Sequence, residues 1–423
     1  MMERKYKDSG IEWIGRIPED WSVERMKGLF TERNERDCKG RTLLSVSQYY
    51  GIRPKSETDI ADSHIAESYD DYKEVYQGDF VMNIMLAWNG SYAVSDYDGM
   101  VSPAYCVFKF RKDCCRKYFH YLLRTNGYPT AFKTMSRGVI DSRLRLYPEQ
   151  FYTFPVIIPS VVEQLQIADY LDEKCREIDS LIGLQEQMIE KLKAYKQSVI
   201  TEAVTKGLNP NAKLVPSGID WIGEIPEGWS KDKVIRCFKK IGSGTTPKST
   251  DDSLFEGNIN WLQSGDINGG DLYEASKHIS EQTLASYSAL SVYPAPFIII
   301  AMYGASVGNI SISHIDACVN QACCVLSDSN LDFNYAFYAL KSAKPYLIYR
   351  AEGGGQPNIS QDKLKTLWVP RPLMEEQQAI ASYLDGKCSE IDKLIAVKQE
   401  KIEKLKDYKK SVIYEAVTGK TIL

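Results

Sequence analysis

This 423-residue sequence has few histidines and no C-x-x-C motif. The four histidines form no H-E-x-x-H motif, and no G-x-G-x-x-G or N-P-P-[FYW] motif is present. The sequence therefore offers no metalloprotease, dinucleotide-binding or amino-methyltransferase signature. The ten cysteines contain no C-x-x-C, which predicts reduced thiols and no bound metal. From these absences we predict a protein that is not an enzyme and binds no cofactor itself.

The sequence also lacks a large net charge, and it has no apolar stretch long enough to span a membrane. The formal net charge of -4 excludes a protein that is basic throughout, although it allows a local basic face. The N-terminus "MMERKYKDSG" has no apolar signal-peptide core. The most apolar stretch, "PFIIIAMYGASVG", is broken by glycines well short of the roughly 18 residues of a membrane span. We predict a cytoplasmic protein without a membrane partner.

What the chain does contain is an internal repeat. The phrase "SGIEWIGRIPEDWS" at residues 9–22 returns as "SGIDWIGEIPEGWS" at residues 217–230, and we call it the repeated phrase. A longer block from Glu163 to Thr205 returns from Glu376 to Thr418. Between these blocks similarity nearly vanishes, although Gly90 can be aligned with Gly308. This order predicts a constant frame with two different recognition domains, each joined to the frame at its repeated phrase.

Each shared block has apolar residues at intervals of seven, which predicts a long helix with a coiled-coil seam. About 40 residues would form a rod about 60 Å long. Because one amphipathic helix cannot bury its own stripe, the expected partner of each copy is the other; packing on its own domain is the alternative. Polar seam residues lower stability but penalise wrong registers. The predicted seam consists of Leu171, Ile178, Leu181, Gln185, Met188, Leu192, Tyr195, Val199, Leu384, Ile391, Leu394, Lys398, Lys401, Leu405, Tyr408 and Val412.

The two variable segments, about residues 26–154 and 234–367, mix β-branched and aromatic runs with Gly/Asn/Asp turns. Each adds a short amphipathic helix, "CCRKYFHYLLRT" or "FNYAFYALKSA". The predicted fold class is therefore α+β, with two compact globular domains in which strands predominate, separated by the two long helices. The predicted boundaries are 1–158 and 209–371 for the domains, and 159–208 and 372–423 for the helical segments.

The first variable segment contains a basic cluster. Ten lysines and arginines between Lys109 and Tyr147 are opposed only by Asp113 and Asp141, a pattern typical of phosphate contact. A solvated basic face is the alternative. Aromatic and amide side chains nearby have the chemistry to stack on bases or bond their edges. The candidate DNA-binding residues are Trp88, Asn89, Tyr105, Lys109, Arg111, Lys133, Arg137, Arg143 and Arg145.

The second variable segment has glycine-rich polar loops, "IGSGTTPKST", "LQSGDINGGD" and "AEGGGQPNIS". These loops either approach DNA closely or are ordinary loops, and the sequence favours neither. "GSGTTPKS" comes near a P-loop, but Pro247 stands where the second glycine belongs, so no nucleotide cradle is expected. The candidates here are Ser243, Thr245, Thr246, Lys248, Gln356 and Asn358.

The repeated phrase, the "EQLQIADYLDEKCREID" helix and their second copies resemble the specificity (S) subunit of Type I restriction-modification systems. The resemblance covers essentially the whole chain, although the variable segments match only in position and texture. It implies two target recognition domains held apart by an antiparallel coiled coil with pseudo-twofold symmetry. Each domain would bind one half of a bipartite site in double-stranded DNA, and the helices would set the spacing between the halves.

The resemblance also implies partners. Two modification subunits would carry S-adenosylmethionine and methylate adenine, and restriction subunits would supply an ATP- and Mg-dependent nuclease. We further expect the tail "TGKTIL" to pack near the first domain and close a circular arrangement. The alternative from another class is a non-catalytic coiled-coil scaffold whose two variable domains bind proteins. A single-strand or RNA binder fits a rigid two-site frame less well.

Overall fold

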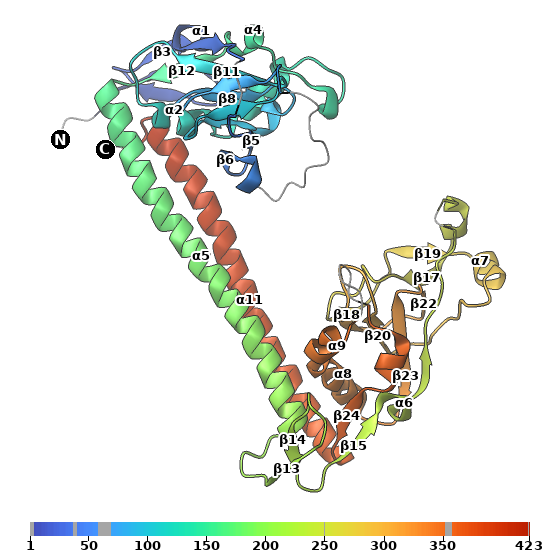
Figure 1. Cartoon of the computed structure of the whole chain (residues 1–423). Coiled ribbons are helices and arrows are strands. Elements are labelled where there is room, and N and C mark those ends of the chain that lie inside the picture. The colour runs from blue at the N-terminus through green and yellow to red at the C-terminus, as the bar shows by residue number, and fades with distance from the viewer. Residues whose placement is uncertain (1–3, 37–39, 58–68, 249, 352–357, 422) are drawn as a thin grey trace. The chain divides into compact units, whose positions relative to one another are not determined.

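The computed structural model describes residues 4–36, 40–57, 69–248, 250–351, 358–421 and 423 (Figure 1). Its contacts divide the chain into two units. The first unit comprises Met1–Glu186 and Glu400–Leu423, and the second comprises Gln187–Gln399. Each unit therefore contains one α+β domain and one half of each long helix, α5 (Val161–Lys206) and α11 (Met374–Val417). We call α5 and α11 the frame helices.

The first domain is built on an antiparallel sheet with the strand order β4-β11-β8-β9. Alternate residues along these strands point to opposite faces. Phe80 and Phe108 pack against the two helices α2 and α3, whereas Val81 and Val107 pack against smaller strands. The bounds are β4 (Phe30–Arg33), β5 (Leu44–Ser47), β6 (Gly51–Pro54), β7 (Lys73–Val75), β8 (Phe80–Asn83), β9 (Tyr92–Val94), β10 (Gly99–Val101), β11 (Tyr105–Phe110), α2 (Arg116–Leu123) and α3 (Gly127–Met135).

The second domain repeats this architecture with an almost unrelated sequence. Its sheet has the order β16-β23-β20-β21-β18, so its first four strands correspond to the sheet of the first domain. Ile298 and Ile300 face α8, while Phe297 and Ile299 face a smaller three-stranded sheet. The bounds are β16 (Phe238–Gly242), β17 (Ile259–Leu262), β18 (Asp271–Leu272), β19 (Lys277–Ile279), α7 (Glu281–Ser286), β20 (Phe297–Ala301), β21 (Ile310–Ser313), β22 (Ala317–Val319), β23 (Cys323–Ser329), α8 (Phe333–Ser342) and α9 (Lys344–Tyr349).

The alignment of Gly90 with Gly308 is confirmed. Both glycines lie in the turn that leads into an equivalent strand, β9 or β21, and both have positive φ angles of 91° and 75°. Side chains with a Cβ rarely adopt this backbone conformation, so a glycine is favoured at each turn. The two variable segments thus share a fold although few identities survive between them.

Short elements flank each domain next to the frame helices. Each repeated phrase supplies the turn and the second strand of a hairpin, β1–β2 or β13–β14. The strands β3 and β15, which begin at the last residue of each phrase, pair with β12 and β24. The bounds are β1 (Tyr6–Asp8), β2 (Arg16–Pro18), β3 (Ser22–Arg25), α1 (Met26–Leu29), α4 (Pro148–Phe151), β12 (Pro155–Ile158), β13 (Leu214–Pro216), β14 (Glu224–Pro226), β15 (Ser230–Lys233), α6 (Val234–Cys237), α10 (Gln361–Lys365) and β24 (Trp368–Arg371).

The frame helices pair antiparallel within each unit. In the first unit, Leu171 near the start of α5 shares a core with Val412 near the end of α11. In the second unit, Leu384 near the start of α11 shares a core with Ile200 near the end of α5. The members of one predicted seam series are all buried or half-buried, as a seam requires: Leu171, Ile178, Gln185, Leu192, Val199, Leu384, Ile391, Lys398, Leu405 and Val412.

The other predicted seam series is wrong. Leu181, Met188, Tyr195, Leu394, Lys401 and Tyr408 are exposed. Residues three and four positions beyond Ile178 lie on the same side of a helix, and the structure places the fourth, Ile182, in the seam. Leu181 and Ile182 are both apolar, so the sequence pattern alone does not separate the two series. The second seam series consists of Cys175, Ile182, Ile189, Lys196, Ala203, Cys388, Ile395, Ile402, Lys409 and Ala416, all buried or half-buried.

Candidate nucleic-acid interface

The repeated phrase fastens each domain to a frame helix. In the first unit the indole N–H of Trp21 donates to Glu163 in the first turn of α5, at 3.2 Å. In the second unit the indole N–H of Trp229 donates to Glu376 in the first turn of α11, at 2.9 Å. The prediction that the phrase joins the domain to the frame is thus confirmed.

A buried glutamine completes each joint. The side-chain oxygen of Gln164 accepts from the backbone N–H of Cys115 at 2.9 Å, and its amide nitrogen donates to the carbonyl of Pro159. Gln377 makes the same pair of bonds with Asp332 and Pro372. Gln164 and Gln377 were not predicted from the sequence, although the glutamine in the "EQ" pair at the start of both shared blocks was a usable signal.

Tyrosines from α2 and α8 add a further matched contact. The Tyr121 hydroxyl donates to Asp172 of α5, and the Tyr338 hydroxyl donates to Asp385 of α11, each at 2.7 Å. Burial alone would raise the pKa of Asp172, but hydrogen bonds from Lys117 and Tyr121 outweigh it and hold that pKa below its usual value. Charge-assisted bonds of this kind are the strong ones, so each domain is held firmly on its helix.

The frame helices are joined by matched ion pairs. Lys409 of α11 bonds both carboxylate oxygens of Asp179 at 2.7 Å in the first unit. Lys196 of α5 bonds Asp392 in the same way in the second unit, at 2.5 to 2.7 Å. These lysines occupy seam positions, so their aliphatic stems are covered while the ammonium groups reach the helix edge. The helix pairing is therefore the same in both units.

The C-terminal tail packs on the first domain, as expected. The Tyr6 hydroxyl donates to the carbonyl of Gly419, and the ammonium group of Lys420 donates to the carbonyl of Ile14. A Cβ at Gly419 would meet Pro18 and Trp21 of the repeated phrase. Gly207, just past the end of α5, lies correspondingly close to Trp229 in the second unit. The residues that follow α11 thus contact the first repeated phrase as the residues that follow α5 contact the second. Only in the second unit is the helix joined to its phrase by continuous chain.

The structure separates the basic candidates of the first domain into two groups. Tyr105 begins β11, whereas Lys109 lies near its far end and Arg111 follows it. At about 3.3 Å per residue, Tyr105 and Arg111 are about 20 Å apart along the strand. The Arg111 guanidinium donates to the carbonyl of Phe30 at 2.8 Å. Lys109 is exposed but belongs with Arg111, away from the other candidates.

The second group gathers around η2 (Ala87–Asn89), α3 and the segment that follows α3. The ammonium group of Lys133 lies 5.0 Å from the Trp88 ring and forms a 2.9 Å ion pair with Asp141. Arg137 and Arg145 exchange backbone hydrogen bonds at 2.9 Å. Arg143 is exposed within the short helix η3 (Asp141–Arg143), and Asn89 accepts from Ser91, which fixes the adjoining turn. This group is the candidate interface of the first unit.

Arg124 attaches a further loop to this group. Its guanidinium donates to the carbonyls of Gln48 at 2.5 Å and Tyr92 at 2.7 Å, and burial lowers its pKa. The turn between β5 and β6, with exposed Tyr49, therefore lies beside Gly90. In the second unit Lys341 at the end of α8 donates to the carbonyl of Gly269, and burial lowers its pKa to about 8. The "QYYG" turn was not predicted as part of the interface, although two adjacent tyrosines before a glycine were a usable signal.

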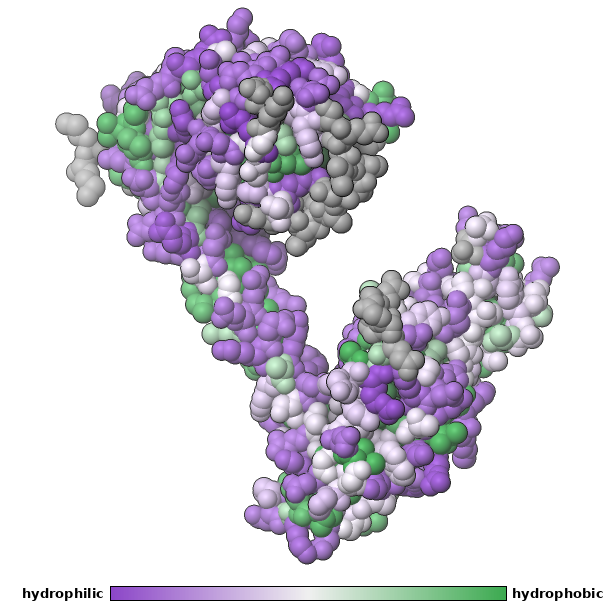
Figure 2. Space-filling model, viewed as in Figure 1, coloured by the Kyte–Doolittle hydropathy of each residue, from purple (hydrophilic) through white to green (hydrophobic). Residues whose placement is uncertain are grey.

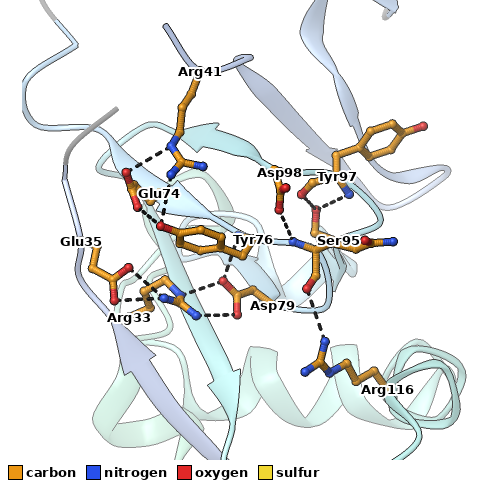
Figure 3. A network of polar contacts seen from close by, with 11 residues as sticks. Arg33, Glu35, Arg41, Glu74, Tyr76, Asp79, Ser95, Tyr97, Asp98 and Arg116 are labelled. Carbon is orange, nitrogen blue, oxygen red and sulfur yellow. Dashed lines mark hydrogen bonds and ion pairs between the residues drawn. The ribbon is translucent and has the colours of Figure 1, made fainter. Parts of the chain in front are cut away.

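Other cations of the first unit are engaged internally. Tyr76 lies between the guanidinium groups of Arg33 and Arg41, at 4.5 and 4.8 Å from its ring (Figure 3). Arg33 pairs with Asp79 at 2.8 Å, and Arg41 pairs with Glu74 at 3.1 Å. Carboxylates thus already neutralise both arginines. We assign this network to anchoring the chain after β4 on β7, not to phosphate contact.

Two glycines of the second domain serve packing. A Cβ at Gly244 would lie 1.8 Å from the carbonyl of Val319, and one at Gly242 would lie 2.2 Å from the Tyr293 hydroxyl. The hydroxyl of Ser243 donates to Cys323, that of Thr246 to Gln321, and the carbonyl of Thr245 accepts from Trp261. Lys248 has an exposed side chain. The glycines of the loop at 242–248 are thus explained by close packing within the domain.

Ile359 of the second domain makes the same backbone contact as Leu146 of the first domain. The N–H of Leu146 donates to Ile84 at 2.9 Å, and the N–H of Ile359 donates to Met302 at 2.7 Å. Asn358 therefore takes the place of Arg145, and it is exposed. Gln356 lies outside the described residues. Tyr349 is 87% exposed next to Arg350, and these are candidates that the sequence analysis did not name.

One enzyme-like motif was overlooked at the sequence level. Gly304–Gly308 has the spacing G-x-S-x-G, which in α/β-hydrolases lies between a strand and a helix. Here it lies between the antiparallel strands β20 and β21, and the Ser306 hydroxyl donates to the carbonyl of Ser264 at 2.5 Å. This turn has neither the backbone setting nor the hydrogen bond of a nucleophilic serine.

Within the described part of the chain, no three His, Cys, Asp or Glu side chains are grouped so that they could hold a metal ion. All nine cysteines in that part are free thiols. None of the helices described is both long and apolar enough to cross a membrane.

Comparison with known proteins agrees with this architecture. Residues 226–407 match the family model of the Type I restriction modification DNA specificity domain. The Type I restriction enzyme MjaVIII specificity subunit of Methanocaldococcus jannaschii is 25% identical, over 96% of this chain and 94% of its own. The EcoBI specificity subunit of Escherichia coli is 23% identical, over 82% of this chain and 74% of its own.

The fold also has a solved counterpart. A chain from a structural study of the complex assembly and conformational transition of the type I R-M system superposes with a TM-score of 0.70 at 18% identity. The match covers 96% of this chain and 99% of that one.

The duplicated joints define a protein with two recognition domains on a helical frame. Although the family model matches only residues 226–407, the same contacts recur in the first unit, and the relatives span both. Over most of its length the chain is similar to Type I restriction enzyme specificity subunits, and residues 226–407 match the family's DNA specificity domain.

Proposed function

We propose that this chain is the DNA-recognition subunit of a Type I restriction-modification complex and binds a bipartite duplex site with one domain per half-site. The observation that carries the proposal is the duplicated joint. Trp21 with Glu163 and Trp229 with Glu376 hold two domains of one fold on equivalent helix starts, while their exposed loops differ. Equivalent attachment with different loops suits the recognition of two different half-sites by the two domains of one chain.

The exposed apolar residues of the frame helices supply a place for partners. Leu181 and Leu184 of α5 are 44% and 49% exposed, and their counterparts Leu394 and Val397 of α11 are 52% and 60% exposed. Figure 2 shows hydrophobic residues at the surface of these helices. Apolar residues at equivalent positions on both helices favour two identical partners, and we assign them to two modification subunits.

In this proposal the chain itself carries no catalytic centre. S-adenosylmethionine would be bound by the modification subunits, and ATP and Mg by the restriction subunits. The complex would act in the cytoplasm, where the cell's DNA lies. The other candidate function, a scaffold with two protein-binding domains, is favoured by no specific contact in the structure.

The direct test is to express the chain with its modification subunits and map methylated adenines across a genome. The proposal predicts one bipartite motif with two half-sites at a fixed separation. Scattered methylation with no motif, or a single unsplit motif, would disprove it. Omitting this chain from the same cells is the matched control and should abolish the motif.

A further inference from the structure

An exposed apolar pair interrupts the basic group of the first domain. We call residues 136–145, between α3 and the backbone contact at Leu146, the tip loop. Within it Val139 is 98% exposed and Ile140 is 53% exposed. In Figure 2, hydrophobic surface is visible beside hydrophilic residues at the outer edge of the first unit. Two neighbouring β-branched residues with so little cover gain nothing from the domain's own core.

The tip loop is held in place by its own bonds. Arg137 and Arg145 exchange two backbone hydrogen bonds of 2.9 Å across its base. The N–H of Arg143 donates to the carbonyl of Ile140 at 2.8 Å, which closes a turn directly behind the pair. Leu144 and Leu146 are buried and anchor the loop on the domain. The apolar pair is thus presented on a braced loop.

The surroundings of the pair match the charge of DNA. Arg137 and Arg143 flank it in the chain, and both side chains are exposed. Lys133 lies over Trp88 on the adjoining η2, but it is already paired with Asp141 of the tip loop, so the two arginines are the cations left for phosphate. Cations around a small apolar tip complement two phosphate strands with a groove between them. The same charges would be poorly placed if the pair bound an apolar surface of another protein.

We propose that Val139 and Ile140 contact the C5-methyl group of a thymine in the major groove of the half-site bound by the first domain. This inference rests on the proposed function. Among the base edges of the major groove the thymine methyl is the apolar feature, and small apolar side chains contact it. Valine is short and stiff at χ1, which suits a surface contact more than insertion between stacked bases. The pair is a specificity determinant, and the arginines beside it bind phosphate.

The test uses the chain assembled with its modification subunits and a duplex carrying the motif found by methylation mapping. Each thymine of both half-sites is replaced singly by deoxyuridine, which removes only the methyl group. We expect one replacement, in one half-site, to weaken binding about three- to five-fold, the value of one buried methyl-sized group. The V139A/I140A double variant should bind the thymine and deoxyuridine duplexes equally.

Val292, which is 38% exposed in the second unit, supplies the matched control. V292A should keep the full preference for thymine. A V139A/I140A variant that keeps wild-type affinity and thymine preference would overturn the inference, as would a wild-type complex indifferent to every replacement. Circular dichroism of the variant separates loss of contact from loss of fold. If the wild-type complex shows no sequence preference at all, the proposed function fails instead.

Discussion

At the scale of single residues, contacts already made within the protein decide which basic side chains remain for DNA. Lys112 pairs with Glu24 at 2.6 Å and Lys117 pairs with Asp172, whereas Arg143 projects from η3 with an exposed side chain. Local excess of positive charge in the sequence therefore overstated the interface. The sequence could show how many cations there are, but not which of them face carboxylates from elements distant in the chain.

Arg143→Ala is expected to weaken duplex binding and to make it less dependent on salt. If Arg143 neutralises one phosphate, its loss should reduce the slope of log affinity against log salt by about 0.9. Lys112→Ala removes the same charge at a paired site and should leave the slope unchanged. Fluorescence anisotropy over a range of salt concentrations measures both. If the two variants have equal effects, Arg143 does not contact a phosphate, and the basic group attracts DNA only through its overall charge.

Asp172 gives the first joint a pH dependence of predictable sign. Its pKa lies below the ordinary value in the folded protein, so it stabilises the fold above about pH 4, and this stabilisation is lost as pH falls through the folded pKa. Asp172→Asn should lower the free energy of unfolding by about 1 kcal/mol at pH 7, since the site is partly exposed.

The difference between wild type and Asp172→Asn should shrink below about pH 4, where the carboxyl of the unfolded chain becomes protonated. Urea unfolding at pH 7 and at pH 3 provides the comparison. Asp169→Asn, on an exposed position of the same helix, is the control and should change little at either pH. A difference that grows toward low pH would show that Asp172 does not have the assigned role.

At the scale of elements, the frame helices show both the strength and the limit of a sequence pattern. The interval of seven predicted the two long helices and one series of residues that are buried or half-buried, because a coiled coil requires that period. It could not choose between Leu181 and Ile182, since both are apolar and lie on neighbouring sides of the helix. What decides is which residues the partner helix covers, and that depends on the tertiary pairing.

Ile189→Ala and Met188→Ala should separate the two roles of the helix surface. Ile189 is buried in the seam, so its truncation should cost about 2–4 kcal/mol in free energy of unfolding. Met188 is 43% exposed, so its truncation should cost less than about 0.5 kcal/mol and instead weaken binding of a modification subunit. Denaturant unfolding and pull-down with the modification subunit measure the two effects. Reversed results would restore the seam predicted from the sequence.

At the scale of the whole molecule, duplication explains why so much could be predicted. The two copies of the repeated phrase, and of the shared block, have similar sequences. Their correspondence is therefore evident from the sequence alone. The common fold of the two domains was hidden, because Phe80 and Ile298 satisfy the same core position with different side chains and only Gly90 and Gly308 mark the correspondence. Base contacts depend on loop tips such as Val139, whose exposure no local pattern reveals.

If the two recognition domains are independent of each other and share one frame, exchanging one of them should leave the other unaffected. Residues 26–154 would be replaced by the corresponding segment of a relative with a known half-site. Methylated adenines would then be mapped with the same modification subunits. We predict that one half-site changes to that of the donor, while the other half-site and their separation stay the same. A change in both half-sites, or in neither, would contradict the account.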